Sequence, residues 1–530
     1  MSRSRSNAAV TWAETMALWL LPALFVASLF AMRDASLPFW QAFNLDPDYY
    51  YLLNGLRLVE GLSPTDVSHP GTPIQVLIAA VIRALHPLDP MERVVDAVLA
   101  DPEGHLMAAT TVIFLLVGAS LWLMGREAFR WGGLAPALLA QSSPFLARII
   151  VKMALHPKPE PFMVIAAALL VAVGFAALRA ERCRDGHAVL AGLVMGFGIC
   201  CKIHFMALGV LPLFLFDRRR VVVYAGVTLL SFGLFFAPAL GSLDIWLDWL
   251  HRVFLGAGAY GDGPQTVIEP GKYVRAIWRL FSAKWFYTGA VILSLSLLLV
   301  HGLALRSGRA APDRRTRLLL GLVAAAFATH VLIAKQPAPH YMVPALMLTG
   351  PMLALLWAIS RESVPERLWR PAWAVLGVVL VVAGGNAQWR QRTELAQWSR
   401  DTQAFVMEER FAACARVYFD AASAKSFAFQ RGDMNALARY SPRLEKLFPA
   451  EEYSWFIFDH TWWKQSLMRW NKPVELDAIL AAHPCTVFRG NQYQRFRDLN
   501  HTMRFDDSCP VGEEMIFTLG VTCDGQPVGR

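Results

Sequence analysis

Long apolar blocks alternate with short basic loops over the first 386 residues. A helix needs about 20 mainly apolar residues to cross a bilayer. On that measure the pattern predicts about eleven spans, at residues 13–32, 105–124, 131–147, 159–178, 187–203, 204–216, 221–240, 286–305, 318–334, 342–360 and 371–386. The pattern is typical of an α-helical polytopic membrane protein.

Two further helical patterns are too short to cross a bilayer. Apolar positions in 49–58 recur at intervals of three and four, and those of 74–85 fall on one face. A polar turn and the corner His69-Pro70-Gly71 separate them. We expect two interfacial helices lying at the membrane surface, within a first external loop at 33–104.

Arginine-rich loops orient the spans. Each of the following carries at least two arginines: 1–6, 125–130, 179–186, 217–220, 306–317 and 360–370. The positive-inside rule makes these loops cytoplasmic, so the N-terminus lies inside and the loop at 33–104 outside. The first apolar run lacks a small-residue cleavage site, so we expect a retained anchor in a bacterial inner membrane.

Composition agrees with this interpretation. Hydrophobic residues make up 55% of the chain and charged residues only 17%, whereas soluble proteins average about 25% charged. The net charge of +9 does not indicate nucleic-acid binding, because the arginine clusters lie in short loops between apolar blocks.

The composition changes near Gln388, and no further membrane block follows. We therefore divide the chain into a transmembrane domain, 1–386, and an external domain, 387–530. A helical pattern at 388–409 leaves the last span. Strand patterns at 415–419, 455–459, 486–489 and 515–519 then alternate with helical ones. This predicts a small periplasmic α/β domain.

Four cysteines fall in that external domain. An oxidising compartment favours disulfides, and four cysteines allow three pairings. Cys414 and Cys485 each precede a strand pattern, and Cys509 and Cys523 flank the last one. We expect the pairs Cys414–Cys485 and Cys509–Cys523. Cys183, Cys200 and Cys201 lie in the membrane or the cytoplasmic loops.

Candidate chemistry gathers in the external loops. Asp46 and Asp48 stand two residues apart before the helix pattern at Tyr49. His69 lies in the same loop, and other external segments contribute Lys152, His156, Lys158, Glu160, Lys202, His204, Lys335, His340 and Tyr341. Acids on one wall of a cavity and bases on another suit a reaction with an anionic leaving group. Prolines in the stretch 151–161 predict that no helix forms there.

Each of these residues also has a plainer interpretation. A role as helix cap and partner of the helix dipole is an equally good interpretation of the two aspartates before Tyr49, and single lysines often anchor spans at lipid headgroups. Asp46 and Asp48 also suit a divalent cation, Mg²⁺ or Mn²⁺, since both prefer oxygen ligands. The stretch 256–261 matches G-x-G-x-x-G, but no strand precedes it, so we reject a dinucleotide site.

Taken together, these features resemble the GT-C glycosyltransferases, which use polyprenyl-phosphate sugars. The similarity is to bacterial relatives of protein O-mannosyltransferases and aminoarabinose transferases, and it covers about residues 13–386. Three features carry it: Asp46-Pro47-Asp48 before a surface helix and His69-Pro70, the glycine-rich run that ends at Lys202, and HYMVPALM. Adjacent acids are usual in the family, whereas a proline separates them here.

The resemblance implies an inverting sugar transfer from a polyprenyl-phosphate donor to a hydroxyl of a periplasmic glycan, lipid or protein. One aspartate would take the hydroxyl proton, and the lysines and His340 would stabilise the departing phosphate. We favour Asp46 as the base, because Asp48 is better placed to cap the helix. A transporter and a noncatalytic scaffold are the alternatives, although no internal repeat supports a transporter.

Overall fold

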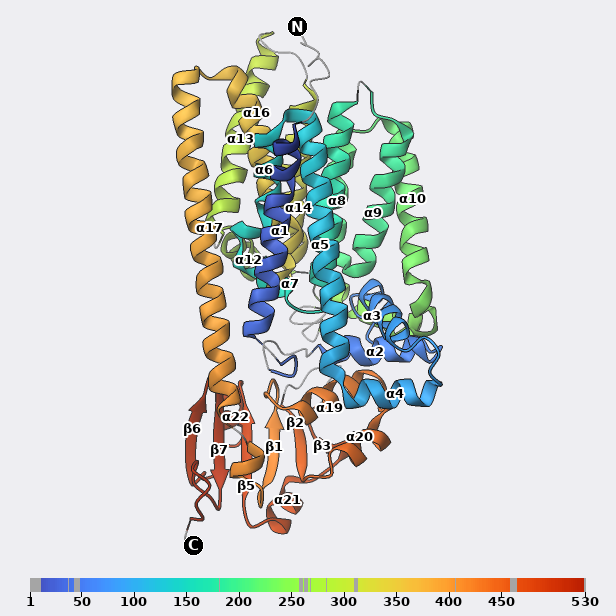
Figure 1. Cartoon of the computed structure of the whole chain (residues 1–530), viewed down its shortest axis with the longest axis vertical. Helices are drawn as coiled ribbons and strands as arrows, with labels where there is room; N and C mark the ends of the chain where they lie inside the picture. Colours follow the sequence, from blue (N-terminus) through green and yellow to red (C-terminus); the bar gives the residue numbers. More distant parts are fainter. Residues whose placement is uncertain are drawn as a thin grey trace.

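Helices form the first three quarters of the chain, and a mixed sheet follows them at one end of the molecule (Figure 1). The computed structural model describes residues 11–528 apart from 37, 42–47, 181, 257–260, 262–265, 267, 283, 309–312, 406 and 458–464. All statements below concern the described residues.

Eight stretches of the described chain are long and apolar enough to cross a membrane. They are α1 (Trp12–Ala35), α5 (Pro102–Gly132), α8 (Pro159–Arg179), the run of α10 and α11 (Arg218–Leu255), α13 (Trp285–Arg306), α14 (Arg314–Ile333), the run from Pro339 to Ser363, and α17 (Glu366–Gln403). Within the two runs lie α10 (Arg218–Phe236), η3 (Ala237–Ser242), α11 (Leu243–Leu255), η5 (Pro339–Met342), α15 (Val343–Leu346) and α16 (Thr349–Ser363). A multi-pass membrane protein is confirmed.

The other three predicted spans coincide with shorter helices. They are α6 (Leu134–Gln141) with η1 (Ser143–Leu146), α9 (Asp185–Cys201) and η2 (Ile203–Phe214). At 1.5 Å per residue, α9 is about 26 Å long, and the 12 residues of the 3₁₀ helix η2 extend about 24 Å. The break between them falls at Lys202, so a charged residue stands where a longer helix would continue.

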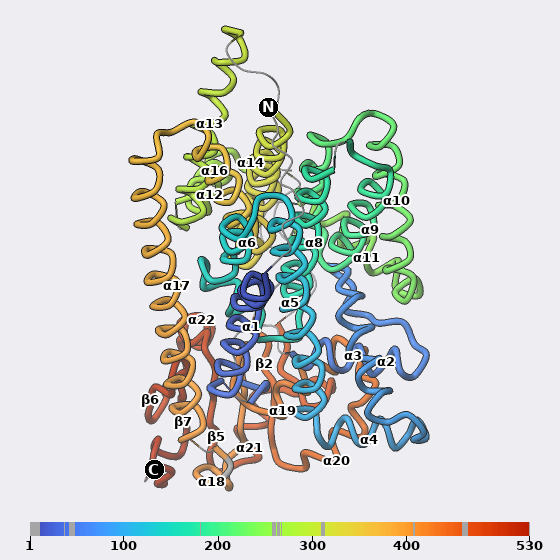
Figure 2. Tube along the Cα trace, turned by 45° about the horizontal axis from the view of Figure 1, so that its top comes forward, coloured from blue at the N-terminus to red at the C-terminus, as the bar shows by residue number. Residues whose placement is uncertain are grey.

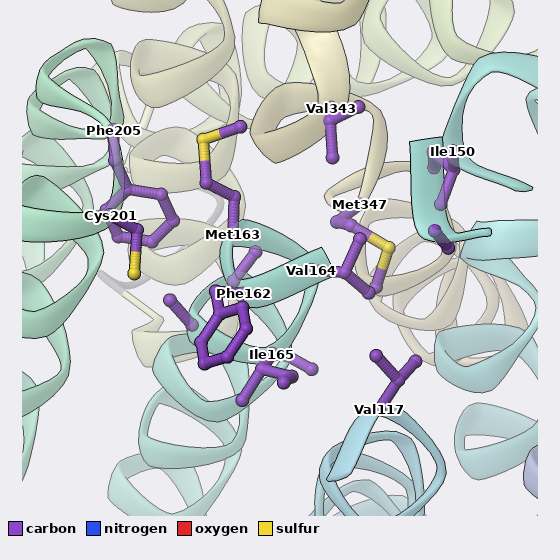
Figure 3. Packing of buried hydrophobic residues seen from close by; sticks show 14 of the residues in the cluster. Val117, Ile150, Phe162, Met163, Val164, Ile165, Cys201, Phe205, Val343 and Met347 are labelled. Atoms are coloured by element: carbon purple, nitrogen blue, oxygen red, sulfur yellow. The ribbon is translucent and has the colours of Figure 1, made fainter. Parts of the chain in front are cut away.

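Close packing holds these short helices in the bundle. Gly196 on α9 lies against α10, where an added Cβ would come within 2.5 Å of the Phe232 nitrogen. Helix α8 is the most central of the long single helices. In its most apolar segment 78% of the residues are buried, compared with 11% in that of α17. Figure 3 shows α8 residues Phe162, Met163, Val164 and Ile165 with Val117, Ile150, Cys201, Phe205, Val343 and Met347 around them.

The basic loops meet at the end of the bundle away from the sheet (Figure 1). Ion pairs join loops that are distant in sequence: Arg179 to Glu127 at 3.3 Å, Arg219 to Asp185 at 3.0 Å, and Arg315 to Glu362 at 2.7 Å. The loops that the arginine pattern grouped together therefore lie on one side.

The first external loop contains α2 (Tyr49–Val59), α3 (Thr72–Leu85) and α4 (Met91–Ala100). The two helices predicted there are present, and α2 is covered by protein rather than exposed. Residues 49–56 are all buried, because α2 is packed between α3 and helix α19 (Lys425–Asn435) of the external domain. Figure 1 shows α2 between the bundle and the sheet.

The external domain is a seven-stranded sheet in the order β4-β3-β2-β1-β5-β7-β6. Strand β1 (Ala415–Phe419) pairs in parallel with β2 (Glu452–Phe456) and β5 (Thr486–Gly490), and the other pairs are antiparallel. The remaining strands are β3 (Ser466–Arg469), β4 (Lys472–Pro473), β6 (Asp507–Val511) and β7 (Glu514–Leu519). Its other helices are α18 (Met407–Arg410), α20 (Ser441–Leu447), α21 (Leu476–Ala482) and α22 (Tyr493–Leu499).

Both predicted disulfides are present, Cys414–Cys485 and Cys509–Cys523. The first joins the residues just before the parallel neighbours β1 and β5, which explains why two distant cysteines meet. The second joins β6 to the chain beyond β7.

Helix α17 connects the bundle to the external domain. Its 38 residues extend about 57 Å, nearly twice the hydrocarbon thickness of about 30 Å. The division predicted between 386 and 387 thus falls inside one continuous helix. Figures 1 and 2 both show α17 along one flank of the bundle, with α9 and α10 at the opposite flank.

Candidate active site

A short turn between α7 (Arg148–Ala154) and α8 brings charged side chains into the interior. His156, Lys158 and Glu160 alternate with prolines and are 2%, 5% and 3% exposed. The prolines prevent a continuous helix, as the sequence predicted, but only across 155–158. The expectation that no helix includes Lys152 is wrong, since Lys152 lies in the last turn of α7.

Asp48 meets this turn from the start of α2. Its Oδ2 accepts a hydrogen bond from His156 Nδ1 at 2.7 Å, and its Oδ1 lies 4.0 Å from Lys158 Nζ. The Asp48 side chain makes no capping hydrogen bond to α2, so the predicted capping role is wrong. The carboxylate instead points into a buried site with cationic neighbours.

Those neighbours set the charge of Asp48. Burial raises the pKa of its carboxyl group, but His156, Lys158 and Arg33 lower it by more, so the pKa lies below its ordinary value. Asp48 is therefore ionised at neutral pH. Beside it, Tyr49 donates its hydroxyl to Glu103 at 2.8 Å, which ties the start of α2 to α5.

A second buried pair continues from the same turn. Lys202 Nζ, at the break between α9 and η2, donates to Glu160 Oε1 at 2.5 Å. The Tyr341 ring centroid lies 4.9 Å from Lys202 Nζ, and the His204 and His340 rings contact that tyrosine at 4.9 and 4.3 Å between centroids. Lys158 and His340 also act electrostatically on Glu160, which links the two pairs into one charged cluster.

The His69 corner positions Lys202 through the backbone. Gly71 donates its amide to the Cys200 carbonyl at 3.0 Å, and Ile203 donates to the His69 carbonyl at 3.0 Å. Burial and the neighbouring Lys202 lower the pKa of His69 well below its ordinary value, so the imidazole is neutral. The predicted corner and the glycine-rich run are thus paired segments of one site.

A mostly apolar pocket of about 110 Å³ adjoins this cluster. Its lining includes His69, His204, Lys335 and Tyr341, together with Ile203, Met206, Trp249, Val253, Phe254, Leu332, Ile333 and Gln336. Lys335 Nζ donates to the Phe254 carbonyl at 2.7 Å, which places the ammonium at the pocket wall. The pocket combines the Lys335 ammonium with a mostly apolar surface.

Not every predicted residue joins this cluster. Lys152 lines a different cavity, between α7 and α17. Asp46 and most of the stretch 256–261 lie outside the described residues. Sequence reasoning also missed Arg33 at the end of α1. The position of Arg33 could have identified it as a site residue, because an arginine at the external end of a span departs from the positive-inside pattern.

The described residues do not include both expected cation ligands, because Asp46 lies outside them. The charges that lower the pKa of Asp48 are those of His156, Lys158 and Arg33. No group of three or more His, Cys, Asp or Glu in the described chain has the arrangement of a metal site. Mg²⁺ needs several oxygen ligands, so we derive no step through a metal.

Neither a family model nor a curated protein matches the chain. Solved structures do: ArnT from Cupriavidus metallidurans bound to undecaprenyl phosphate matches with a TM-score of 0.50 and 12% identity, over 94% of this chain and 97% of that one. Its apo state gives a TM-score of 0.51, with the same identity and coverage. This chain has the GT-C fold. At 12% identity the match establishes the fold, and the site must be argued from its own residues.

Archaeal oligosaccharyltransferase AglB from Archaeoglobus fulgidus, solved with an inhibitory peptide and a dolichol-phosphate, also matches. Its TM-score is 0.45 at 11% identity, over 83% of this chain and 65% of that one.

Proposed function

We propose that this chain is an inverting glycosyltransferase that moves a sugar from a polyprenyl phosphate to a hydroxyl of a periplasmic acceptor. One observation carries the proposal: the cluster that runs from Asp48 to Lys202 is buried, charged and adjacent to an apolar pocket. A carboxylate next to several cations, beside a surface suited to a prenyl chain, matches the needs of this reaction.

The donor would occupy the pocket beside η2. Lys202 and Lys335 would bind the phosphate, and Met206, Val253 and Leu332 would contact the first isoprene units. Glu160 holds the Lys202 ammonium in place, which reduces the entropy that it would lose on binding phosphate. The similar ArnT structure was solved with undecaprenyl phosphate, which agrees with a donor of this class.

The transfer would be a single displacement at the anomeric carbon. The acceptor oxygen forms the new bond as the bond from carbon to phosphate oxygen breaks, and the electron pair remains on the phosphate. The hydroxyl proton passes to an aspartate. The lowered pKa of Asp48 makes it a weak base, so we keep Asp46 as the base and assign Asp48 to holding His156 and Lys158 in position.

The test is release of polyprenyl phosphate from a purified chain supplied with polyprenyl-phosphate sugar and an envelope extract as acceptor. Asp46→Asn should lower the rate by about 10²–10⁴-fold, the usual contribution of acid–base catalysis. Lys202→Ala should lower it by about 10²–10³-fold, as for loss of one stabilising donor. Asp48→Asn should have the smaller effect of the two aspartate changes.

Two surface changes serve as controls. Asp96→Asn and Lys472→Ala remove exposed charges that pair with Arg443 and Glu445, away from the cluster. Both should retain wild-type release, and all five proteins should elute and melt as folded membrane proteins. Wild-type release by all three site variants would refute the proposal and favour a transporter or a scaffold.

A further inference from the structure

A second cavity, of about 370 Å³, opens between the bundle and the external domain. It falls within the range of about 300–1,000 Å³ that is typical of ligand sites. Helix α7 contributes Arg148, Ile149 and Lys152, and α17 contributes Gln391, Glu394, Leu395 and Trp398. Lys284, Pro339 and Glu513 complete the lining, the last from the turn between β6 and β7.

Two lysines in this cavity have no partner among the described residues. No described acid forms an ion pair with the ammonium of Lys152 or of Lys284, and both side chains are only half-exposed. Arg148 is paired with Glu394 across the cavity. Burial and the nearby Arg148 lower the pKa of Lys284. Glu513 also lines the cavity, so its described side chains carry three positive and two negative charges.

Helix α7, which carries Lys152, is held firmly against α17. Gln391 is buried, and its amide, suitably oriented, accepts from the Lys152 backbone nitrogen at 3.0 Å and donates to the Arg148 carbonyl at 3.1 Å. These bonds fix α7 against α17. On the other side, Gly512 lies so close to the Trp398 indole that an added Cβ would be 3.1 Å from it, so the external domain is packed against the cavity.

One short helix separates this cavity from the apolar pocket. Pro339 lines the second cavity and Tyr341 lines the apolar pocket, and both belong to η5. Two ligands could therefore approach the same segment from opposite sides. The apolar pocket suits a prenyl chain. The second cavity combines charged side chains with apolar ones and one indole, which suits a sugar with a charged group.

We propose that this cavity binds the acceptor through a phosphate-sized anionic group, with Lys152 and Lys284 as its ligands and Trp398 against a sugar ring. This deepens the proposed function and rests on it, because it assigns the acceptor an anionic, sugar-bearing head. It also moves Lys152 from the donor side, where the sequence placed it, to the acceptor side.

Lysine acetylation followed by mass spectrometry tests this without any turnover. The full chain would be labelled in phosphatidylcholine nanodiscs, alone, with glucose 1-phosphate, or with undecaprenyl phosphate. Glucose 1-phosphate should protect Lys152 and Lys284 at least three-fold and leave Lys202 unchanged. Undecaprenyl phosphate should protect Lys202 and Lys335 but not the other pair.

A fourth sample, in phosphatidylglycerol nanodiscs, separates the sources of the anion. Protection there without added sugar phosphate would show that a lipid headgroup supplies the anionic group of the acceptor, and protection only by glucose 1-phosphate would indicate a soluble or glycan phosphate. Protection of Lys152 and Lys284 by undecaprenyl phosphate, or by none of these probes, would overturn the proposal. Protection of this lysine pair by undecaprenyl phosphate would still be compatible with the glycosyltransferase function.

Variants connect binding to transfer. Lys284→Gln should raise the KM for the acceptor at least ten-fold and leave the KM for the donor within two-fold. Lys272→Gln is the matched control, since that exposed lysine pairs with Glu269 outside the cavity and should change neither constant. A rise in the donor KM alone would assign the cavity to the donor.

Discussion

At the scale of single residues, the charge of Asp48 depends on its neighbours. Lys158 lies 4.0 Å from the carboxylate and favours its ionised form. Lys158→Gln removes that positive charge, so the pKa of Asp48 should rise. Because transfer needs Asp48 ionised, the acidic limb of the pH–rate profile should move to higher pH, and activity should be lost earlier as the pH falls.

The measurement is transfer rate against pH for Lys158→Gln and the wild type. Lys272→Gln should leave the acidic limb unchanged, since it removes a positive charge of the same kind at a distance from Asp48. An acidic limb at the same pH in Lys158→Gln would show that Asp48 does not control the rate. A shift to lower pH would contradict the assigned electrostatics.

The sequence predicts which charged residues belong to the site better than it predicts how they pair. Asp48, Lys202 and the turn at 156–160 stand out because polar groups near apolar spans are costly unless they serve a cavity. Which acid meets which base depends on how helices pack, and spacing along the chain does not encode that. The expected cap at Asp48 is absent because its carboxylate pairs with the buried His156 and Lys158 instead of the first amides of α2.

At the scale of elements, the contact between α2 and α19 joins the two domains. Gly432 of α19 lies so close to α2 that an added Cβ would be 2.9 Å from the Tyr49 carbonyl oxygen. Gly432→Ala must therefore push the helices apart or distort one of them. Such overpacking typically costs about 1–3 kcal/mol. We expect a lower melting temperature and faster proteolysis of the external domain.

Gly377→Ala is the matched control. It also lies inside a helix, but an added Cβ there meets nothing within 4 Å, so the change should be neutral or slightly stabilising. Equal melting temperatures for Gly432→Ala and Gly377→Ala would mean that α2 and α19 are not in close contact.

The two disulfides should differ in their contribution to stability. Cys414–Cys485 closes a loop with a sequence separation of 71, whereas the separation for Cys509–Cys523 is 14. If a disulfide acts mainly on the unfolded chain, the longer loop contributes more, about 4 against 3 kcal/mol. Replacing both cysteines of the first pair by serine should lower the unfolding midpoint of the external domain more than the same change in the second pair. The reverse order would point to native-state contacts instead.

Elements with strong periodicity were predictable, and their local distortions were not. The strand pattern at 415–419 coincides with β1, and both disulfide pairs followed from the strands that carry them. Strands β3, β4 and β6 were missed because they lie at or next to the sheet edges, where alternation is weak. The span expected at 204–216 is a 3₁₀ helix, because it must pack against α14 while leaving Lys202 at the site.

At the scale of the whole molecule, charge separates the two ends of the bundle. The arginine-rich loops pair with one another at one end, and α2, which begins just after Asp48, lies with the sheet towards the other (Figure 1). The core continues from the bundle into the external domain, since Phe429, Tyr440 and Trp470 belong to the same apolar cluster as α8. The two domains therefore share one apolar core.

Orientation in the membrane is the last prediction. Positive loops tend to remain in the cytoplasm, and disulfides favour an oxidising compartment, so two independent features predict a periplasmic sheet. An alkaline phosphatase reporter fused after Val528 should be active, and one inserted after Gly308, beyond α13, should be inactive. A fluorescent reporter that matures only in the cytoplasm should give the opposite result at each position. Activity of one reporter at both positions would place the arginine loops and the sheet on the same side, and the acceptor could not then approach from the periplasm.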